Sequence, residues 1–548
     1  MDTKALRQKI LDLAIRGKLV PQDPNDEPAS VLLERIREQK QQMVKEGKLK
    51  KKDIKNDSVI FVGEDNLHYE KFANGSVKCI EAEIPFELPK EWAWTRISTV
   101  ALFVGGYAYK SSKYVPDSRN ILIRIGNIKN NSINPFVAKT CISDEYASET
   151  DSYLIRENDI LFTMTGTRGK RDYFYSCRIE KSDLESLKLF LNQRVGCLRL
   201  VSTADILPSY FVNAIQSSCV LDAIFATETG NVNQGNIGST ATLNLLIPVA
   251  PTEEQYKIQE KSLSILSAIE QYDIETEDLL AIINMLRTKI LDLAIRGQLV
   301  PQNPDDEPAS VLLERIRAEK NELIKQGKLK PNKKESIIFK GEDNSYYEKL
   351  GEDVCCIDEE IPYDIPDSWE WVRLKNCCIK EIRRGKSPKY AAKSNTLVFA
   401  QKCNTKYNGI DIGLALYLDE STLGRYPNEE YMHDSDVVVN STGTGTLGRI
   451  GFYRTTDNFP GLPIVPDSHV TVIRGFRSIR AFYLYIFMKA NQSVLEKKGE
   501  GSTNQKELKP ITLKEMLVPM PPVSEQQRIE NAIITAFSYV EMIEKSLN

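Results

Sequence analysis

The residues best suited to catalysis stand in a glycine-rich run, TGTGTLG at 442–448, and in a loose nuclease-like pattern after it. The run matches the G-x-G-x-x-G fingerprint of dinucleotide sites, but that fingerprint opens a helix. The residues that follow it, RIGFYRT, predict a strand, so we expect a tight hairpin. The second pattern joins Pro466–Asp467 to Glu496, Lys497 and Lys498, and its glutamate falls within a predicted helix. We therefore expect neither pattern to catalyse a reaction.

Other catalytic and metal-binding motifs are missing from the sequence. It has no GxxxxGK[ST] loop for ATP and no N-P-P-[YF] tetrapeptide typical of amino-methyltransferases. Ten cysteines form no C-x-x-C pair, and only His68, His433 and His469 could join them, so a zinc site is not expected. We expect reduced thiols and no metal or cofactor held by this chain.

Polar and basic residues gather with glycine, serine and threonine in several predicted loops. In a major groove arginine suits guanine and asparagine or glutamine suits adenine, while lysine suits phosphates. Each residue alone is more often a solvated surface group. Clustering in both halves of the chain leaves that interpretation and contact with double-stranded DNA as open alternatives. The candidates in the first half are Lys110, Lys113, Arg124, Asn127, Arg168, Lys170, Arg171, Gln193 and Gln234. The candidates in the second half are Arg383, Arg384, Lys386, Lys389, Gln401, Lys402, Arg449, Asn504 and Gln505.

The charge balance is uneven along the chain. The net charge of the 548 residues is −4. Between 375 and 516, however, 21 Lys and Arg stand against 14 Asp and Glu, a surplus of seven, while 98–245 holds 15 against 14. Attraction to phosphates is therefore possible locally.

The chain contains an internal sequence repeat. LRQKILDLAIRGKLVPQDPNDEPASVLLERIREQK at 6–40 returns at 286–320 with about 29 of 35 positions identical. IPFELPKEWAWTRI at 84–97 and LLIPVAPTEEQYKI at 245–258 return as IPYDIPDSWEWVRL and MLVPMPPVSEQQRI. The intervening blocks are nearly unrelated. A copied block suggests a surface that binds the same partner twice, and a divergent block suggests two different things being read; a recent duplication without functional meaning is the alternative.

A heptad seam predicts a long helix between the two copies. Nine of eleven positions that step by four and three from Ile258 to Leu293 are apolar, and Gly297 with Pro301 ends the pattern. The terminal segments 524–548 and 1–17 resemble its two halves, so we expect them to pair with it antiparallel; a helix packed in a globular core is the alternative. The residues predicted to pack are Ile265, Ile269, Leu279, Ile283, Leu286, Ile290 and Leu293.

Each copied block also contains VPQ-x-P-x-DEPAS-VLLERIR followed by a lysine-rich stretch, Lys45–Lys55 or Lys325–Lys334. The proline-rich run cannot be helical, and Ser30 or Ser310 is expected to cap the amphipathic helix after it. This pattern predicts a short helix on a tether. The lysines are either a solvated linker or a DNA clamp, and we favour the linker.

The divergent blocks predict mixed α/β structure. Strand-like runs stand at 120–128, 159–164 and 195–201 and again at 396–402, 436–442 and 468–474, each set followed by a helix, at 209–224 or 480–498. We therefore predict an α+β fold with two mixed α/β recognition domains joined by a pair of long antiparallel helices in a pseudo-two-fold repeat. The predicted segments are 1–83, helix and arm; 84–245, first recognition domain; 246–297, central helix; 298–360, second arm; 361–516, second recognition domain; and 517–548, C-terminal helix.

Along its whole length the sequence resembles the specificity subunit of type I restriction–modification systems. The residues that carry the resemblance are the paired KILDLAIRG…LVPQ…DEPAS…LLERIR blocks, the paired W-x-W segments and the paired P-x-x-P-x-x-EQ helix entries. GGYAYKS…IRIGNI and RGKSPKY…VVVNSTGTGTLGR also resemble two different recognition-domain types of that family.

The resemblance implies a division of labour. Each recognition domain reads one half of a split DNA site, and the helices fix the gap. Two modification subunits dock on the repeated helices and methylate adenine with S-adenosylmethionine, and restriction (motor-nuclease) subunits cut with ATP and Mg²⁺. This chain is then non-catalytic. An enzyme with a degenerate nuclease or methyltransferase site, and a coiled-coil protein that binds no DNA, are the alternatives. With no signal peptide or apolar span, we expect a cytoplasmic protein.

Overall fold

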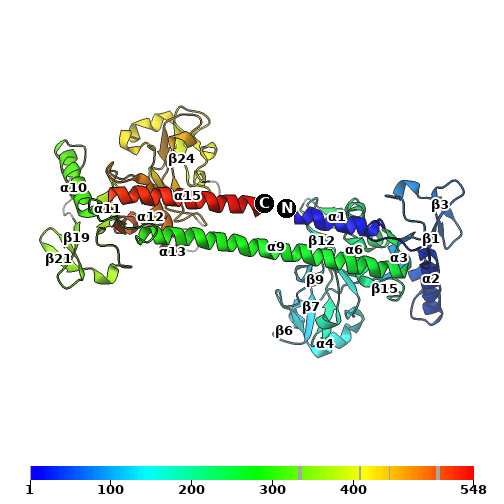
Figure 1. The fold of residues 1–548 in the computed structure, drawn as a ribbon. Helices are drawn as coiled ribbons and strands as arrows, with labels where there is room; N and C mark the ends of the chain where they lie inside the picture. Colours follow the sequence, from blue (N-terminus) through cyan, green and yellow to red (C-terminus); the bar gives the residue numbers. More distant parts are fainter. Residues whose placement is uncertain are drawn as a thin grey trace. The chain divides into compact units, whose positions relative to one another are not determined.

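The computed structural model describes residues 2–231, 233–330, 336–406, 409–443, 445–500 and 506–547. Two compact units make up the chain, Met1–Glu275 and Thr276–Asn548, and one long helix, α9 (Thr252–Ile295), contributes residues to both (Figure 1). Among the described residues no helix is long and apolar enough to cross a bilayer.

The copied arm of the first unit consists of a helix, α2 (Ala29–Lys45), and a three-stranded antiparallel sheet that the sequence analysis did not predict. The strands are β1 (Ser58–Val62), β2 (His68–Phe72) and β3 (Val77–Cys79). α2 buries Ala29, Leu33 and Ile36 in the same hydrophobic core as Ile97 and Phe162. The helix is therefore fixed to its unit, and the prediction of a helix on a tether was wrong.

The start of this helix also differs from the prediction. The cap positions of α2 and of its copy α10 (Ala309–Lys325) are Pro28 and Pro308, not Ser30 and Ser310, and no side chain caps either helix. Instead, the amide of Ala29 donates to the carbonyl of Glu91 (2.9 Å), as that of Ala309 does to Ser368 (3.0 Å). The first free amide of the helix is thus satisfied by a distant segment, which no local sequence pattern reveals.

The divergent block of the first unit is built on two four-stranded sheets. One has the order β14–β7–β10–β6, with β14 (Lys188–Leu191), β7 (Asn120–Ile123), β10 (Cys141–Ile142) and β6 (Tyr114–Val115). The other has the order β13–β11–β15–β5, with β13 (Ser176–Arg178), β11 (Ile160–Thr163), β15 (Val195–Leu200) and β5 (Ala101–Gly105). β11 and β15 confirm two predicted strands. Of the predicted strand at 120–128, only β7 and the two-residue β8 (Ile128–Lys129) form.

The helix predicted at 209–224 is two helices, α6 (Pro208–Ile215) and α7 (Ser218–Phe225). The Ser217 hydroxyl donates back to the Ala214 carbonyl (2.6 Å), and the buried Gln216 amide donates to the Ser176 carbonyl (2.8 Å). A serine that bonds its own turn and a glutamine held by another strand interrupt the helix at this point. The helix predicted at 480–498 is divided in the same way at Asn491, into α12 (Ala481–Ala490) and α13 (Gln492–Lys497).

The second unit repeats the arm and carries its own sheets. The arm sheet comprises β19 (Ser336–Lys340), β20 (Tyr346–Leu350) and β21 (Asp353–Cys356). The block after it contains a sheet in the order β23–β25–β24–β28 and another in the order β27–β26–β29. Their strands are β23 (Tyr390–Ala391), β25 (Leu416–Leu418), β24 (Leu397–Phe399), β28 (Ile464–Pro466), β27 (Ile450–Phe452), β26 (Val437–Asn440) and β29 (Val470–Ile473). β24, β26 and β29 confirm the three predicted strands of this block.

The first residues of each recognition block pair with its last strand. In the first unit β4 (Ala93–Arg96) lies antiparallel to β18 (Leu246–Val249), and in the second β22 (Glu370–Arg373) lies antiparallel to β30 (Leu517–Met520). These paired strands are the copied W-x-W and helix-entry segments. The copied segments on either side of each divergent block therefore form a pair of neighbouring strands.

Each unit pairs part of α9 with a terminal helix. In the first unit Arg7 of α1 (Thr3–Ile15) binds Asp273 of α9 at 3.0 Å. In the second, Arg287 of α9 binds Glu544 of α15 (Val523–Leu547) at 2.6 Å. Arg7 and Arg287 occupy the same position in the copied sequence.

The predicted seam of α9 is only partly buried. Ile269, Ile283 and Ile290 are at most 8% exposed, whereas Leu279 and Leu286 are 36% and 44% exposed. Ile265 and Leu293 are half-buried. Arg287 of α9 contacts Glu544, which lies three residues before the end of α15. In the second unit, therefore, little of α15 remains to cover the residues of α9 that precede Arg287.

Candidate nucleic-acid interface

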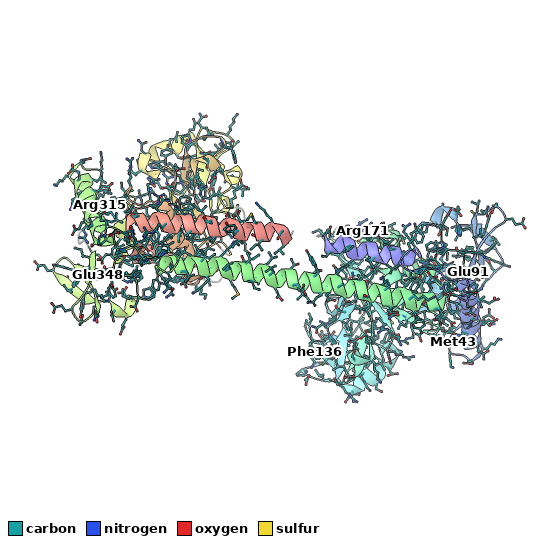
Figure 2. The ribbon with its side chains drawn as sticks, viewed as in Figure 1. Met43, Glu91, Phe136, Arg171, Arg315 and Glu348 are labelled. Carbon is teal, nitrogen blue, oxygen red and sulfur yellow. The ribbon has the colours of Figure 1, made fainter. Side chains whose placement is uncertain are left out.

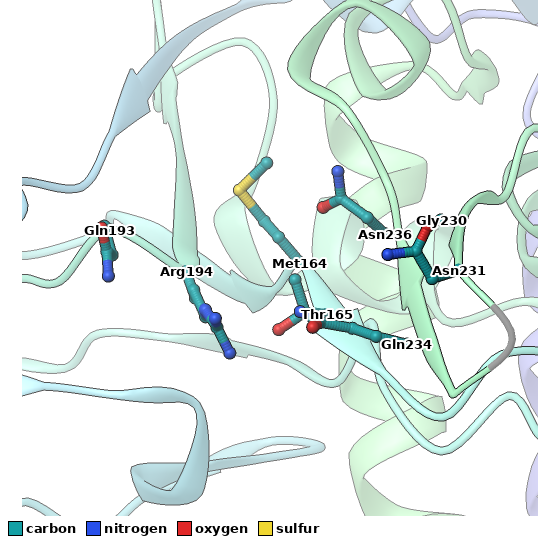
Figure 3. A pocket seen from close by; sticks show the side chains of 8 residues that line it. All are labelled: Met164, Thr165, Gln193, Arg194, Gly230, Asn231, Gln234 and Asn236. Atoms are coloured by element: carbon teal, nitrogen blue, oxygen red, sulfur yellow. The ribbon is translucent and has the colours of Figure 1, made fainter.

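An open pocket of about 370 Å³ lies in the first unit at the edge of a small antiparallel sheet. The sheet has the order β12–β17–β16, with β12 (Thr165–Gly166), β17 (Gln234–Asn236) and β16 (Thr229–Asn231). The turn after β14 supplies the remaining wall (Figure 3). The pocket is lined by Met164, Thr165, Gln193, Arg194, Gly230, Asn231, Gln234 and Asn236.

Two glycines allow the strands of this sheet to approach closely. Gly230 has a φ of +128°, and a Cβ there would lie 2.1 Å from the Gln234 carbonyl oxygen. At Gly235 a Cβ would lie 2.1 Å from a carboxylate oxygen of Glu228. The clash at Gly230 is with backbone, so β16 and β17 can approach this closely only with glycine at that position.

The polar side chains of the pocket have no partner within the described part of the chain. Gln193, Arg194, Asn231, Gln234 and Asn236 are all exposed, and none of their side chains donates or accepts a hydrogen bond there. Four carboxamides and one guanidinium therefore remain available to a ligand. Carboxamides suit adenine and guanidinium suits guanine or phosphate.

The residues behind the pocket, by contrast, form hydrogen bonds with one another. The Tyr173 hydroxyl donates to Glu228 (2.8 Å), and the Gly169 amide donates to the same carboxylate (3.1 Å). Burial, and then the bond to Glu228, hold the pKa of Tyr173 well above its ordinary value, so the hydroxyl stays protonated as a donor. Arg168 donates to the Gly230 carbonyl (2.9 Å). These contacts fix the β16–β17 hairpin against the loop that follows β12.

The structure separates the candidates of the first unit into three groups. Gln193 and Gln234 line the pocket, and Lys110 and Lys170 are exposed without a side-chain partner among the described residues. A second group is engaged: Lys113 with Glu149 (3.0 Å), Arg171 with Asp222 (2.6 Å), Arg168 with Gly230, and Arg124 over the Tyr114 ring. Asn127 is 5% exposed and donates to the carbonyls of Asn134 and Val137, so it supports its own turn.

Three pocket residues, Arg194, Asn231 and Asn236, escaped the sequence analysis. The signal for Asn231 and Asn236 is the segment TGNVNQGN at 229–236, in which four amide residues lie between or beside two glycines. In a hairpin that spacing turns alternate side chains to the same face. Arg194 stands next to Gln193 but has no such pattern around it.

In the second unit the basic candidates surround a buried carboxylate. Glu430 is 2% exposed and binds Lys380 (3.1 Å), Arg383 and Lys386 (3.7 Å). Burial opposes the ionisation of Glu430, but the charges of these three cations outweigh it and hold its pKa below the ordinary value. Arg383 and Lys386 therefore hold their loop together, which explains the basic cluster without a ligand.

The other candidates of this unit are also largely engaged. Arg449 donates to the carbonyls of Asn404 (2.8 Å) and Gly445 (3.0 Å), and Arg384 pairs with Glu507 at 3.0 Å. Gln401 accepts a weak bond from Thr446. Lys389 and Lys402 are exposed, and Asn504 and Gln505 lie outside the described residues.

The two patterns that resemble catalytic motifs lie in different elements of the second unit. β26 and β27 flank the glycine-rich run as an antiparallel pair, which confirms the strand predicted after it. Nine residues, 441–449, connect the two strands, so the connection is longer than the predicted tight hairpin. Asp467 is buried and accepts the His469 amide (2.8 Å), while Glu496 lies on α13. No cluster of three metal-ligating side chains occurs among the residues that the structure describes.

The fold and the pocket define a class of protein. Two α+β units have recognition blocks that are nearly unrelated in sequence, and one of them presents amides and a guanidinium that have no partner among the described residues. Such groups are suited to read DNA.

Comparison with known proteins identifies the family. Residues 89–285 and 366–548 match the family described as Type I restriction modification DNA specificity domain. The chain therefore belongs to the family of type I restriction–modification specificity subunits.

Several relatives share this assignment. The EcoEI specificity subunit of Escherichia coli is 25% identical over 99% of this chain and 90% of its own length. The EcoAI subunit of the same species is 29% identical over 68% of this chain and 62% of its own. A solved HsdS subunit from Thermoanaerobacter tengcongensis covers 85% of this chain and 94% of its own at 16% identity, with a TM-score of 0.39.

Proposed function

We propose that this chain directs a type I restriction–modification complex to a bipartite DNA site, with one recognition block reading each half. The pocket of unpaired amides and Arg194 carries the proposal, because these groups lie on a block that belongs to the DNA specificity family. The second block would read a different sequence, since segments 98–240 and 375–510 are nearly unrelated in sequence.

The paired helices serve as the spacer in this proposal. The Arg7–Asp273 and Arg287–Glu544 pairs occupy corresponding positions of the two copies and support an antiparallel coiled coil with pseudo-two-fold symmetry. Two modification subunits would dock on the copied helical regions, and restriction subunits would join them in the cytoplasm. Methylation with S-adenosylmethionine and cleavage with ATP and Mg²⁺ would belong to those partners, and this chain would be non-catalytic.

Mapping of methyladenine in cells with and without this gene tests the assignment. We expect one bipartite motif to lose methylation when the gene is deleted. Replacement of 98–240 alone by the corresponding block of another specificity subunit should change one half of the motif and leave the other half intact. A change in both halves, or in neither, would contradict the proposal.

Deletion of one heptad, residues 276–282, tests the spacer. The deletion keeps the seam in register and shortens the helix by about 10.5 Å, which is close to three base pairs at about 3.4 Å each. We expect the gap in the methylated motif to shrink while both halves stay the same. Deletion of four residues, which breaks the register, is the control and should abolish methylation.

The enzyme alternative has a direct test. The purified chain is incubated with DNA, Mg²⁺ and S-adenosylmethionine in the absence of partners. We expect neither methylation nor cleavage. Methylation would reject the non-catalytic proposal, whereas cleavage that persists in Glu496→Gln would point to a contaminating nuclease. Turnover that this substitution abolishes would reject the non-catalytic proposal.

A further inference from the structure

Each unit carries a lysine-rich run directly after the arm helix. Residues 45–55, KEGKLKKKDIK, hold six lysines against one glutamate and one aspartate. In the second unit, 325–330 reads KQGKLK, with three lysines and no acidic residue. These runs contrast with a chain whose net charge is −4.

The carboxylates beside the first run already bind other groups. Glu46 pairs with Lys48 at 2.8 Å, and Asp53 accepts the backbone amide of Lys50 at 2.8 Å. Asp57 binds the buried Lys40 at 2.6 Å. Within the described residues no carboxylate pairs with the exposed side chains of Lys51, Lys52 and Lys55, so their positive charge faces solvent.

The backbone of the run is held in the same turn in both copies. Gly47 and Gly327 have φ values of +71° and +68°, directly after α2 and α10. The amides of Leu49 and Leu329 then donate to the carbonyls of Met43 and Leu323, both at 3.2 Å. The first lysines of each run therefore leave the arm helix in a defined direction.

The arm helix is itself fixed to the recognition block. Lys40 is fully buried and donates to the Ser98 carbonyl (2.7 Å) as well as to Asp57. The core that encloses Ala29, Leu33 and Ile36 also contains Ile237, which follows the pocket strand β17. The arm helix and the residue after β17 thus pack in one hydrophobic core. Figure 2 labels Met43, near the end of the arm helix from which the lysine run continues.

We propose that the two lysine-rich runs bind the phosphates of duplex DNA that flanks the recognition site, one run on each side. This inference rests on the proposed function, because it requires DNA on the recognition blocks. Lysine is depleted at protein–protein interfaces but is a common phosphate ligand. The unpaired lysines therefore favour DNA over an acidic protein surface.

Binding to flanking phosphates has a measurable signature. Each phosphate neutralised contributes about 0.9 to the slope of log affinity against log salt concentration. Removal of three lysine charges that each neutralise a phosphate should make that slope shallower by up to about 2.7. The effect should vanish when the flanking DNA is removed, because base reading does not involve these lysines.

The test uses the complex with its modification subunits and two duplexes that contain the mapped site. One duplex ends at the outer base pairs of the two half-sites, and the other extends past them by two helical turns, about 20 base pairs on each side. The test variant is Lys51→Gln, Lys52→Gln and Lys55→Gln together. The matched control is Lys71→Gln, Lys181→Gln and Lys188→Gln, three exposed lysines of the same unit. A triple change of the test lysines to Arg keeps the charge.

We expect the test variant to bind the long duplex more weakly and with a shallower salt dependence, and to bind the short duplex as the original protein does. The control and Arg variants should match the original protein in affinity and salt dependence on both duplexes. Equal affinity on both duplexes for all variants would overturn the inference. An equal loss on both duplexes would also overturn it, because the lysines would then act at the site itself. Unchanged DNA binding with weaker capture of the restriction subunit would assign the run to a protein partner instead. Specific binding to the short duplex would in each case leave the proposed function intact.

Discussion

The two recognition blocks treat their polar loop residues in opposite ways. In the first, Arg194 and four carboxamides line a pocket and have no side-chain partner in the part of the chain that the structure describes. In the second, Arg383 and Lys386 surround the buried Glu430, and Arg449 donates to backbone carbonyls. Both sets stand in or beside loops that contain glycine. The difference teaches that a basic cluster in a sequence can stabilise a loop as readily as it can contact a ligand.

The largest expected effect follows from removing the Glu430 carboxylate. Glu430→Ala leaves Lys380, whose side chain is 6% exposed, without its carboxylate. Breaking a buried pair costs about 3–5 kcal/mol of unfolding free energy, so calorimetry should show a marked fall in the melting temperature of the second unit. Glu429→Ala, an exposed neighbour, is the control. If both variants melt alike, the cluster is not structural.

Substitutions in the pocket of the first block should weaken DNA binding without lowering thermal stability. Arg194→Ala and Asn231→Ala remove exposed side chains that have no partner among the residues described, so thermal stability should stay unchanged. DNA binding by the complex should weaken by about 1–3 kcal/mol for each side chain that reads a base, as measured by titration on the mapped site. Arg178→Ala, which breaks a surface pair with Glu180, is the control. If Arg178→Ala weakens binding as much as Arg194→Ala does, the pocket is not a specific reader.

The sequence predicted the structure well where the determining contacts are local. The strand after the glycine-rich run and the end of α9 before Gly297 follow from strand and helix-capping preferences. The strand β11 follows from its apolar, β-branched residues. The start of α2 was missed, because its first amide is satisfied by Glu91, more than sixty residues away along the chain.

Site residues were harder to predict for the same physical reason. Whether an arginine is available depends on which carboxylate or carbonyl lies beside it in space. Arg383 and Arg194 look alike in the sequence, yet one meets Glu430 and the other meets no partner among the described residues. Asn127 was predicted to contact DNA, but its amide closes a turn through Asn134. Such pairings come from the tertiary fold alone.

The copied segments provide the opposite case, in which two regions should behave identically. Trp92 donates to Glu254 at 2.8 Å in the first unit, and Trp369 donates to Glu525 at 2.9 Å in the second. Trp92→Phe and Trp369→Phe each leave a buried carboxylate with one donor fewer, at a cost of about 1–3 kcal/mol. We expect the two variants to lower the melting temperature of their own unit by similar amounts. A fall in melting temperature in only one unit would show that the divergent block of that unit alters the contribution of its tryptophan–glutamate hydrogen bond.

The smallest expected effect concerns the ion pairs of the helices. Arg7–Asp273 and Arg287–Glu544 have side chains that are 28–38% exposed, and pairs of this kind contribute about 0–1 kcal/mol. Arg7→Ala and Arg287→Ala should therefore change the melting temperatures little and equally, and high salt should remove the difference from the original protein. The apolar seam, not these charges, would then hold each helix pair. A large destabilisation by one substitution alone would mean that its pair fixes the helix register in that unit, and the two copies would no longer be mechanically equivalent.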